Sequence, residues 1–263
     1  MALHVLLARQ RSGTGAFGSI LDQHPAIRYL GEVFHPNERK HEVNYFNFLL
    51  TKITANPERG LAMANEENYR EFAAHVETRG RKKNVIIDVK YSSTHHFNGP
   101  WHSPFDMPKF VMLCRQDKRR ILHLKRRNFL KTFVSGRLAD LNAVWHARPD
   151  DQLAVTKLTV EIPAMMNYLR VTGRTVNHFD GYLRKYPHVL ELEYEVLFPS
   201  DGAISSEVMT RVAGFLDVEA GPLVAAAPAF VKQTSDNLSG VLENYEEVTA
   251  ALKGTEFAWM SGD

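Results

Sequence analysis

The chain has 263 residues, of which 44% are hydrophobic, and its formal net charge at pH 7 is +2. This length and composition allow a full hydrophobic core, so we expect one α/β domain over residues 1–263, with or without a helical appendage. The small net charge excludes a general attraction to nucleic acid, so any anion site must be local. The single cysteine, Cys114, excludes an intrachain disulfide framework and a zinc cluster built on thiolates.

Residues 3–25 carry the most informative local pattern of the chain. An apolar run at 3–8 predicts a strand, a turn rich in Gly, Ser and Thr follows, and a helical pattern from Ala16 stops at Pro25. Such a unit places unpaired backbone N–H groups at a helix N-terminus, where the helix dipole favours an anion. The pattern predicts a phosphate or sulfate site, and a tight turn that needs glycine only for steric reasons is the alternative.

The residue types within this loop suit an anion. Gly13 and Gly15 would let the backbone approach the anion closely, because glycine has no side chain to obstruct it. Arg11 would supply a charged planar donor, and Ser12 and Thr14 would supply hydroxyl groups.

Two well-known nucleotide loops fit this stretch incompletely. The ATP-type loop G-x-x-x-x-G-K-[ST] matches the spacing from Gly13 to Gly18, but Ser19 stands where the lysine belongs. The dinucleotide fingerprint can be placed on Gly13, Gly15 and Gly18, with Glu32 near the distance expected of its acidic residue. A nucleotide-dependent kinase, which would also need Mg²⁺, is therefore one alternative function.

Strands and helices alternate along the rest of the chain. Further strands are predicted at 27–30, 84–92, 121–125 and 189–198, the last running into a turn. Helices are predicted within 39–80, at 110–120, 129–143, 152–185 with interruptions near Pro163 and Gly173, 205–218, and in two pieces after Phe230. Residues 93–108, rich in Pro, Gly and His, predict a loop. The alternation predicts a mainly parallel central sheet flanked by helices.

A second anion site is predicted where the strand at 121–125 ends. Arg126 and Arg127 follow this strand, and Asn128 is a good N-cap for the next helix. Ser135 lies eight residues after Arg127, about two helical turns on, so both side chains can converge on one phosphate. The alternative is a solvated basic patch, which would suit a noncatalytic polyanion- or nucleic-acid-binding protein.

Taken together, the two sites resemble those of the sulfotransferases that use 3′-phosphoadenylyl sulfate (PAPS). The strand, the segment Arg11–Thr14 and the helix resemble the family's 5′-phosphosulfate loop. Arg127, Asn128 and Ser135 resemble its 3′-phosphate signature. Because the two motifs match the two ends of one cofactor, the pair is more specific than either motif alone.

Further segments carry the same resemblance. LGEVF at 30–34 is similar to an element of bacterial carbohydrate sulfotransferases, those acting on trehalose or on nodulation factors in particular. LEYEVLF at 192–198 and the stretch 232–248 resemble later family segments. The loop departs from the family pattern at Gln10, where Pro is usual, and at Gly15, where a second Thr is common.

The resemblance implies a P-loop-kinase-like sulfotransferase fold, with a helical part at about 40–80 and 140–185 that shapes the acceptor site. It implies transfer of a sulfuryl group from PAPS, as co-substrate and without a metal, to an acceptor hydroxyl. Glu32 would be the general base, and Arg11 would stabilise charge on the leaving group. Tyr194 is equally compatible with a core position. The implied cofactor-binding residues are Arg11, Ser12, Gly13, Thr14, Gly15, Ala16, Arg127, Ser135, Tyr194 and Lys232.

The acceptor is less well defined by the sequence. His95, His96 and His102 offer imidazole ligands without accompanying carboxylates, so we expect no metal there. These histidines, with Trp101 and Trp145, would instead line the acceptor cleft. The resemblance favours a carbohydrate or glycolipid hydroxyl, so the expected partner is a small-molecule or glycan acceptor rather than nucleic acid.

The expected location follows from the absence of long apolar segments. No stretch reaches transmembrane length, and the run at 3–8 is too short for a signal peptide. We therefore expect a cytoplasmic, bacterial enzyme without a membrane span. The sequence leaves the oligomeric state open.

Overall fold

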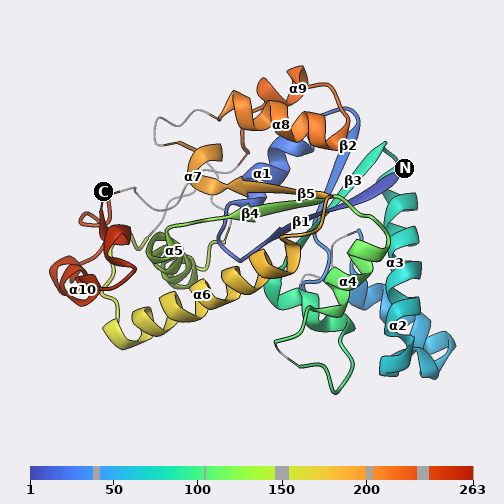
Figure 1. The fold of residues 1–263 in the computed structure, drawn as a ribbon, viewed down its shortest axis with the longest axis horizontal. Coiled ribbons are helices and arrows are strands. Elements are labelled where there is room, and N and C mark those ends of the chain that lie inside the picture. The colour runs from blue at the N-terminus through green and yellow to red at the C-terminus, as the bar shows by residue number, and fades with distance from the viewer. Residues whose placement is uncertain (38–41, 104, 146–153, 200–203, 230–236, 263) are drawn as a thin grey trace.

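A five-stranded sheet forms the centre of the chain in the computed structural model (Figure 1). The structure describes residues 1–263 except 38–41, 104, 146–153, 200–203, 230–236 and 263. The strands are β1 (Ala2–Ala8), β2 (Ile27–Glu32), β3 (Asn84–Lys90), β4 (Ile121–Lys125) and β5 (Val189–Glu193). Their order is β2-β3-β1-β4-β5, and every neighbouring pair is parallel. The predicted α/β fold with a parallel sheet flanked by helices is confirmed.

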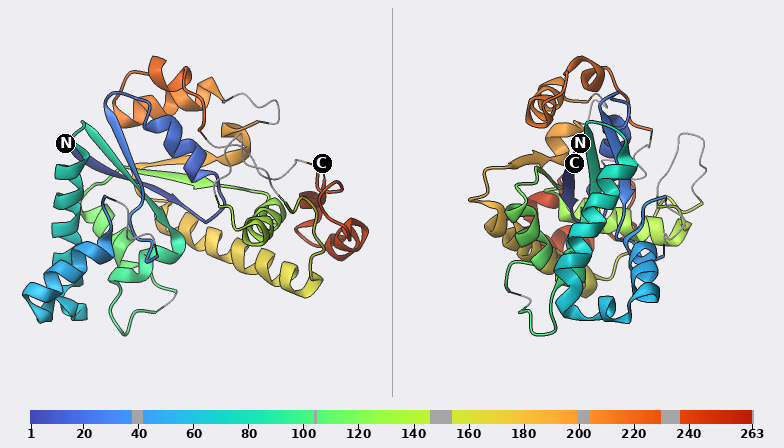
Figure 2. Two further views of the ribbon diagram at one scale, coloured as in Figure 1. Left: turned by 180° about the vertical axis from the view of Figure 1, so that it is seen from behind. Right: turned by 90° about the vertical axis from the view of Figure 1, so that its right-hand side faces the viewer.

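Helices connect the strands and cover both faces of the sheet (Figures 1 and 2). The α-helices are α1 (Thr14–Leu21), α2 (Tyr45–Ala55), α3 (Asn65–Gly80), α4 (Lys109–Gln116), α5 (Phe129–Asn142), α6 (Ile162–Leu183), α7 (Tyr194–Leu197), α8 (Ser206–Leu216), α9 (Gly221–Val224) and α10 (Tyr245–Leu252). The 3₁₀ helices are η1 (Pro57–Gly60), η2 (Ala62–Ala64), η3 (Tyr91–Phe97) and η4 (Ala258–Ser261). Within the described part of the chain, no helix combines the length and apolar character that crossing a membrane requires.

The central strands β1 and β3 are buried on both faces, and the sequence of β1 is accordingly almost continuously apolar. Alternate residues of β1 serve two cores. Leu3, Val5 and Leu7 pack with α3, α4 and the C-terminal part of α6, whereas Leu6 and Ala8 pack with α1 and α8. Cys114 lies in the first of these cores, where burial raises the pKa of its thiol to about 12 and keeps it protonated.

A third hydrophobic cluster lies beyond the carboxyl ends of the strands. It joins Leu130 and Val134 of α5, Met165 and Leu169 of α6, and Val248 of α10. Figure 1 shows this group of helices at the end of the molecule where the strand arrows point. Part of the region predicted to be helical, 140–185, therefore forms a helical extension beside the loop end of the sheet.

Three local predictions differ from the structure. Helix α6 runs without interruption through Gly173, because its buried face, which includes Met165, Leu169 and Phe179, outweighs the cost of one helical glycine. Pro163 lies in the first turn of α6, where proline is tolerated. The strand predicted at 189–198 ends at Glu193 and is followed by α7, and η3 occupies the start of the predicted loop.

Candidate functional site

The loop between β1 and α1 has the backbone of an anion-binding turn. Arg11 and Gly13 both have positive φ, 63° and 84°, and α1 begins directly afterwards at Thr14. Backbone of this kind turns successive N–H groups toward one side and forms a concave anion site. No side chain caps this end of α1, and its first turn has no acidic residue. The N–H groups near Thr14, Gly15 and Ala16 are thus oriented for an anion.

Tyr194, which is distant from this loop in the sequence, packs its ring against Gly13. A Cβ atom on Gly13 would lie 2.5 Å from a ring carbon of Tyr194, so the aromatic ring fits only above a glycine. The guanidinium of Arg126 lies 4.6 Å from the centroid of the same ring. Tyr194 is the first residue of α7, not a strand residue as predicted, and it lies against the anion loop, partly buried beside the second core.

Arg11 and Ser135 meet although 124 positions separate them. The Nε and Nη2 atoms of Arg11 donate to the Ser135 hydroxyl at 3.3 and 2.8 Å. A third nitrogen, Nη1, donates to the carbonyl of Trp145 at 2.5 Å. Burial and the nearby charge of Arg126 both lower the pKa of Arg11, which shows how densely positive charge is placed here. One residue of each predicted anion site is thus joined in a single cluster.

Arg127 does not join this cluster. Its guanidinium Nη2 pairs with Glu193 at 2.6 Å, on the partly exposed side of β5. The backbone N–H groups of Arg127 and Asn128 donate to the carboxylate of Glu195, each at 3.0 Å to Oε1. Asn128 caps α5 as predicted, its side chain accepting from the N–H of Lys131.

No specific role was predicted for Arg126 from the sequence. Its side chain is buried, with 8% of the residue exposed, and its Nη1 donates to the Arg11 carbonyl at 3.2 Å. Two adjacent arginines at a strand end point to opposite sides, and sequence alone does not decide which one faces the loop. Arg126 therefore supports the loop directly, whereas Arg127 faces the β5 carboxylates.

The second feature that sequence analysis missed is a buried lysine beside the loop. Lys90, at the end of β3, is 3% exposed. Its Nζ contacts the Thr14 hydroxyl at 2.5 Å, both oxygens of Asp88 at 2.8 and 2.7 Å, and Glu32 Oε1 at 3.2 Å. We call these four residues, with Tyr29, the Lys90 network. The available signal was the pair of charged residues inside the otherwise apolar strand 84–90.

Glu32 reaches this network because β2 is irregular. The register between β2 and β3 shifts between Tyr29 and Glu32, and Gly31 has a φ of 68°, which glycine adopts without strain. The bulge turns Glu32 to a place beside Asp88 of β3, within reach of Lys90. Burial raises the pKa of Glu32 above its ordinary value, the charge of Lys90 opposes this, and Asp88 adds to it.

Tyr29 completes the network as a hydrogen-bond donor. Its hydroxyl donates to Asp88 Oδ2 at 2.9 Å. Burial and the charge of Asp88 raise the pKa of Tyr29, so the hydroxyl stays protonated. The Tyr29 ring also lies against Gly18 of α1, where a Cβ atom would lie 2.2 Å from it.

Of the residues predicted to line the acceptor cleft, Trp145 contacts this cluster through Arg11. His95 and His96 are exposed, Trp101 is 97% exposed, and Trp145 contributes its carbonyl to Arg11. Their predicted place in an acceptor cleft stays a prediction. Lys232 lies outside the described residues.

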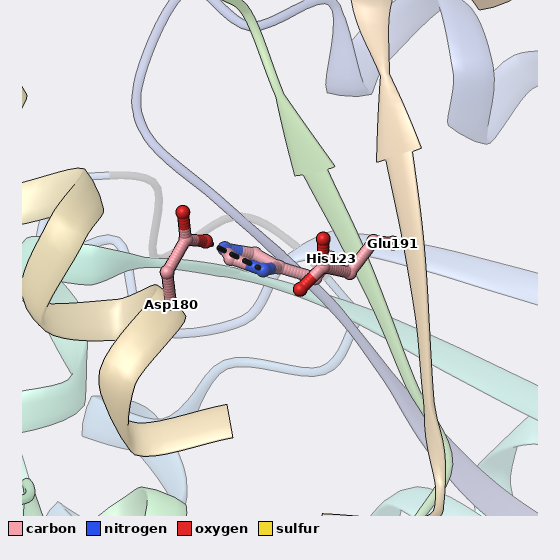
Figure 3. A group of neighbouring side chains, drawn as sticks. All are labelled: His123, Asp180 and Glu191. Atoms are coloured by element: carbon pink, nitrogen blue, oxygen red, sulfur yellow. Dashed lines mark ion pairs between the residues drawn. The ribbon is translucent and has the colours of Figure 1, made fainter. Parts of the chain in front are cut away.

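A second group of titratable side chains lies on the α6 side of the sheet (Figure 3). Ligand atoms of His123, Asp180 and Glu191 lie within 4.8 Å of one another, and Figure 3 shows the two carboxylates on opposite sides of the imidazole. Lys125 Nζ bonds to Asp180 at 3.0 Å and Glu191 at 2.9 Å. A divalent cation would have to displace this ammonium group, so the residues form an ion-pair network that ties α6 to β4 and β5.

A cavity lies at the amino ends of the strands, opposite the loop end of the sheet. It has a volume of about 820 Å³ and is lined at the amino ends of β1 and β3 by residues that include His4 and Asn84. Several of its charged residues pair with one another, among them Lys83 with Asp217 and Arg119 with Glu77. None of the predicted site residues lines it.

Comparison with known proteins finds likeness among solved structures. No family model matches the chain, and no curated protein matches it. Among solved structures, the chain is similar to mouse sulfotransferase SULT7A1 complexed with PAP. The alignment covers 99% of this chain and 87% of that chain, at 11% sequence identity and a TM-score of 0.44.

Proposed function

We propose that this chain transfers a sulfuryl group from PAPS to an acceptor hydroxyl. The observation that carries the proposal is the position of Lys90, whose ammonium lies among Thr14, Asp88 and Glu32 at the start of α1. In P-loop NTPases, a Mg²⁺ ion beside the phosphate loop is held by the Ser or Thr of that loop and by an aspartate. Here a built-in ammonium contacts both of those residue types.

An ammonium at this position suits sulfuryl better than phosphoryl transfer. A terminal sulfuryl group carries less negative charge than the terminal phosphoryl group of ATP, so one fixed positive charge can balance it. A kinase using the same loop would need a divalent cation between Thr14 and Asp88, where Lys90 already bonds to both. This argument favours the sulfotransferase over the kinase alternative.

The proposed roles follow from the contacts of each residue. The N–H groups near Gly13, Thr14 and Gly15 would hold the 5′-phosphate, and Arg11 would balance charge that develops on the leaving oxygen. Ser135, already bonded to Arg11, would contact the 3′-phosphate. Arg127 would exchange its exposed pairing with Glu193 for the same phosphate.

Glu32 is the proposed general base. A base for a hydroxyl must be within hydrogen-bond reach and have a pKa closer to the working pH than an exposed carboxylate has. Burial raises the pKa of Glu32 in this direction, and its contact with Lys90 holds it next to the loop. Lys90 would then neutralise charge on the sulfuryl oxygens as the acceptor oxygen attacks in line with the leaving group.

The acceptor is proposed to be a carbohydrate or glycolipid hydroxyl, in a cytoplasmic enzyme. This part of the proposal rests on the GE element at 31–32, which the resemblance connects with carbohydrate acceptors. Aromatic side chains such as Trp145, which is half-exposed beside Arg11, are suited to stack on a sugar ring.

Calorimetric titration of adenosine 3′,5′-bisphosphate tests the proposal, with AMP and ATP–Mg²⁺ as comparison ligands. We expect the bisphosphate to bind at micromolar concentration, AMP to bind more weakly because it lacks the 3′-phosphate, and EDTA to leave bisphosphate binding unchanged. Equal affinity for AMP would contradict a 3′-phosphate site. Tighter binding of ATP with Mg²⁺ would favour the kinase, and binding of any polyanion without preference would favour the noncatalytic alternative.

A further inference from the structure

Helix α6 presents a face of uncompensated positive charge. Arg170, Arg174 and His178 follow one another at intervals of four residues, and Arg184 and Lys185 continue the same face past the helix end. All five are exposed. Over its 22 residues, α6 contains a single acidic residue, Asp180, whose carboxylate bonds to Lys125 on the sheet side.

These cations have no acidic partners nearby. Among the described residues, Arg170, Arg174, Arg184 and Lys185 take part in no ion pair or side-chain hydrogen bond. The opposite face of α6 is buried and consists of Met165, Leu169, Thr172, Val176, Phe179 and Leu183. The charge is therefore held on one side of a packed helix roughly 33 Å long, judged from its rise per residue.

A segment with two exposed aromatic side chains contacts α6 through Phe105. Trp101 is 97% exposed and Phe105 is 76% exposed, both in the segment between η3 and α4. The Tyr182 hydroxyl of α6 donates to the Phe105 carbonyl at 3.0 Å, and the Phe105 and His178 rings lie 6.4 Å apart. In Figure 1 this segment projects beyond the helices on the same side of the sheet as α6.

We propose that this face is a peripheral docking surface for an anionic lipid bilayer. We call it the α6–loop surface, consisting of Arg170, Arg174, Arg184, Lys185, Trp101 and Phe105. Basic side chains on an exposed helix face are attracted to anionic headgroups, and Trp and Phe partition into the headgroup–acyl boundary. The one acidic residue of the loop, Asp106, is outnumbered by the four cations.

The aromatic pair is what favours a bilayer over a soluble polyanion. A polyanion without aromatic bases would need only the cations, and its binding would be indifferent to two apolar rings in water. Exposure of almost the whole Trp101 side chain to water is unfavourable in free energy. Insertion of the ring into a bilayer interface removes this unfavourable exposure. The surface contains no residue of the β1–α1 loop or of the Lys90 network. The test of this inference is therefore independent of the proposed transfer reaction.

Vesicle co-sedimentation tests the inference with the full chain. Vesicles of phosphatidylcholine alone are compared with vesicles that also contain phosphatidylserine, at low and high salt. The charge variant is Arg170→Glu with Arg174→Glu, and the aromatic variant is Trp101→Ser with Phe105→Ser. Arg211→Glu on α8, across the sheet, and Met63→Ser are matched controls, since both residues are exposed and outside the surface.

We expect the protein to bind only the anionic vesicles and to be released by salt. The charge variant should bind at least roughly tenfold more weakly, the aromatic variant should also lose binding, and the controls should not. Tryptophan emission should shift to the blue on vesicle binding, except in the aromatic variant. Failure to bind anionic vesicles would overturn the inference. Vesicle binding that the charge variant loses but the aromatic variant keeps would also overturn it, because the surface would then attract anions by charge alone.

Discussion

At the scale of single residues, Glu32 is the proposed base, and its surroundings disfavour the charged carboxylate. Its carboxylate is partly buried beside Asp88, and Lys90 is the main group that offsets the cost of its charge. A group whose pKa is raised by folding stabilises the protein only in its protonated form, and that stabilisation is lost as the pH rises through the raised pKa. If Glu32 is the base, as proposed, its charged form would therefore serve the reaction at some cost in stability.

The substitution Glu32→Gln separates these two effects. We expect sulfuryl transfer to fall by about 10²–10⁴-fold, the usual contribution of a general base, while bisphosphate affinity is kept. The unfolding temperature should be unchanged or higher, because the neutral amide removes a buried charge. In the unsubstituted enzyme, the acidic limb of the pH–rate profile should lie above the ordinary carboxyl pKa of 4.5. Full activity of Glu32→Gln would exclude this residue as the base.

Lys90 is the second residue whose removal has a defined consequence. The change Lys90→Met leaves Asp88, which is almost fully buried, without its cation. Breaking a buried pair by removing one partner costs about 3–5 kcal/mol, so the free energy of unfolding measured in denaturant should fall by that amount. The exposed pair Lys83–Asp217 provides the control, and Lys83→Met should cost at most about 1 kcal/mol. Equal costs at both positions would contradict the buried network.

At the scale of elements, the ends of β4 and β5 decide how the second phosphate site is built. Arg126 supports the anion loop, and Arg127 pairs with Glu193. Glu195 accepts from the backbone N–H groups of Arg127 and Asn128, directly before α5. The exposed pairing of Arg127 is weak and can be exchanged for a phosphate at little cost. The proposed 3′-phosphate site thus requires only a side-chain movement.

The variant Arg127→Ala tests this arrangement. If Arg127 contacts the 3′-phosphate, its loss should lower bisphosphate affinity about tenfold or more and leave AMP affinity unchanged, because AMP has no group at that position. Arg137→Ala, an exposed arginine further along α5, is the control and should change neither affinity. A variant that weakens both nucleotides equally would show that Arg127 acts through structure alone. Titration calorimetry measures all four affinities.

At the scale of the whole molecule, buried histidines set the response of folding to acid. Burial lowers the pKa of His4 to about 4 and that of His123 to about 3, both from 6.5. Between these values and about pH 6.5, the two histidines are protonated in the unfolded chain but remain neutral in the folded chain. The free energy of unfolding therefore falls as the pH drops through this range.

Denaturant unfolding at pH 7 and pH 5 measures this dependence. The variant His4→Gln can keep a donor for the side-chain Oδ1 of Asn84, which the His4 ring contacts at 2.8 Å, but cannot take up a proton. We expect its loss of stability between the two pH values to be smaller than that of the unsubstituted protein by about 1–2 kcal/mol. Identical losses would mean that His4 is accessible to protons in the folded state.

The sequence by itself determined the local parts of this protein. The largely apolar runs at 3–8, 84–92 and 121–125 predicted the three central strands, because strands buried on both faces need mostly apolar residues. The Gly-containing turn before α1 and the N-cap at Asn128 depend on neighbouring residues only, so they too were predictable. The alternation of strands and helices was enough for the parallel α/β class.

The tertiary structure alone decided which charged side chains meet. Lys90 joins Thr14 because β3 lies next to β1, and Glu32 joins Lys90 because a bulge in β2 turns it inward. Arg126 rather than Arg127 supports the loop because the two residues face opposite ways at the end of β4. Local sequence patterns record how each segment buries its own apolar atoms, whereas these ion pairs depend on strand order and register, which only the complete packed sheet defines.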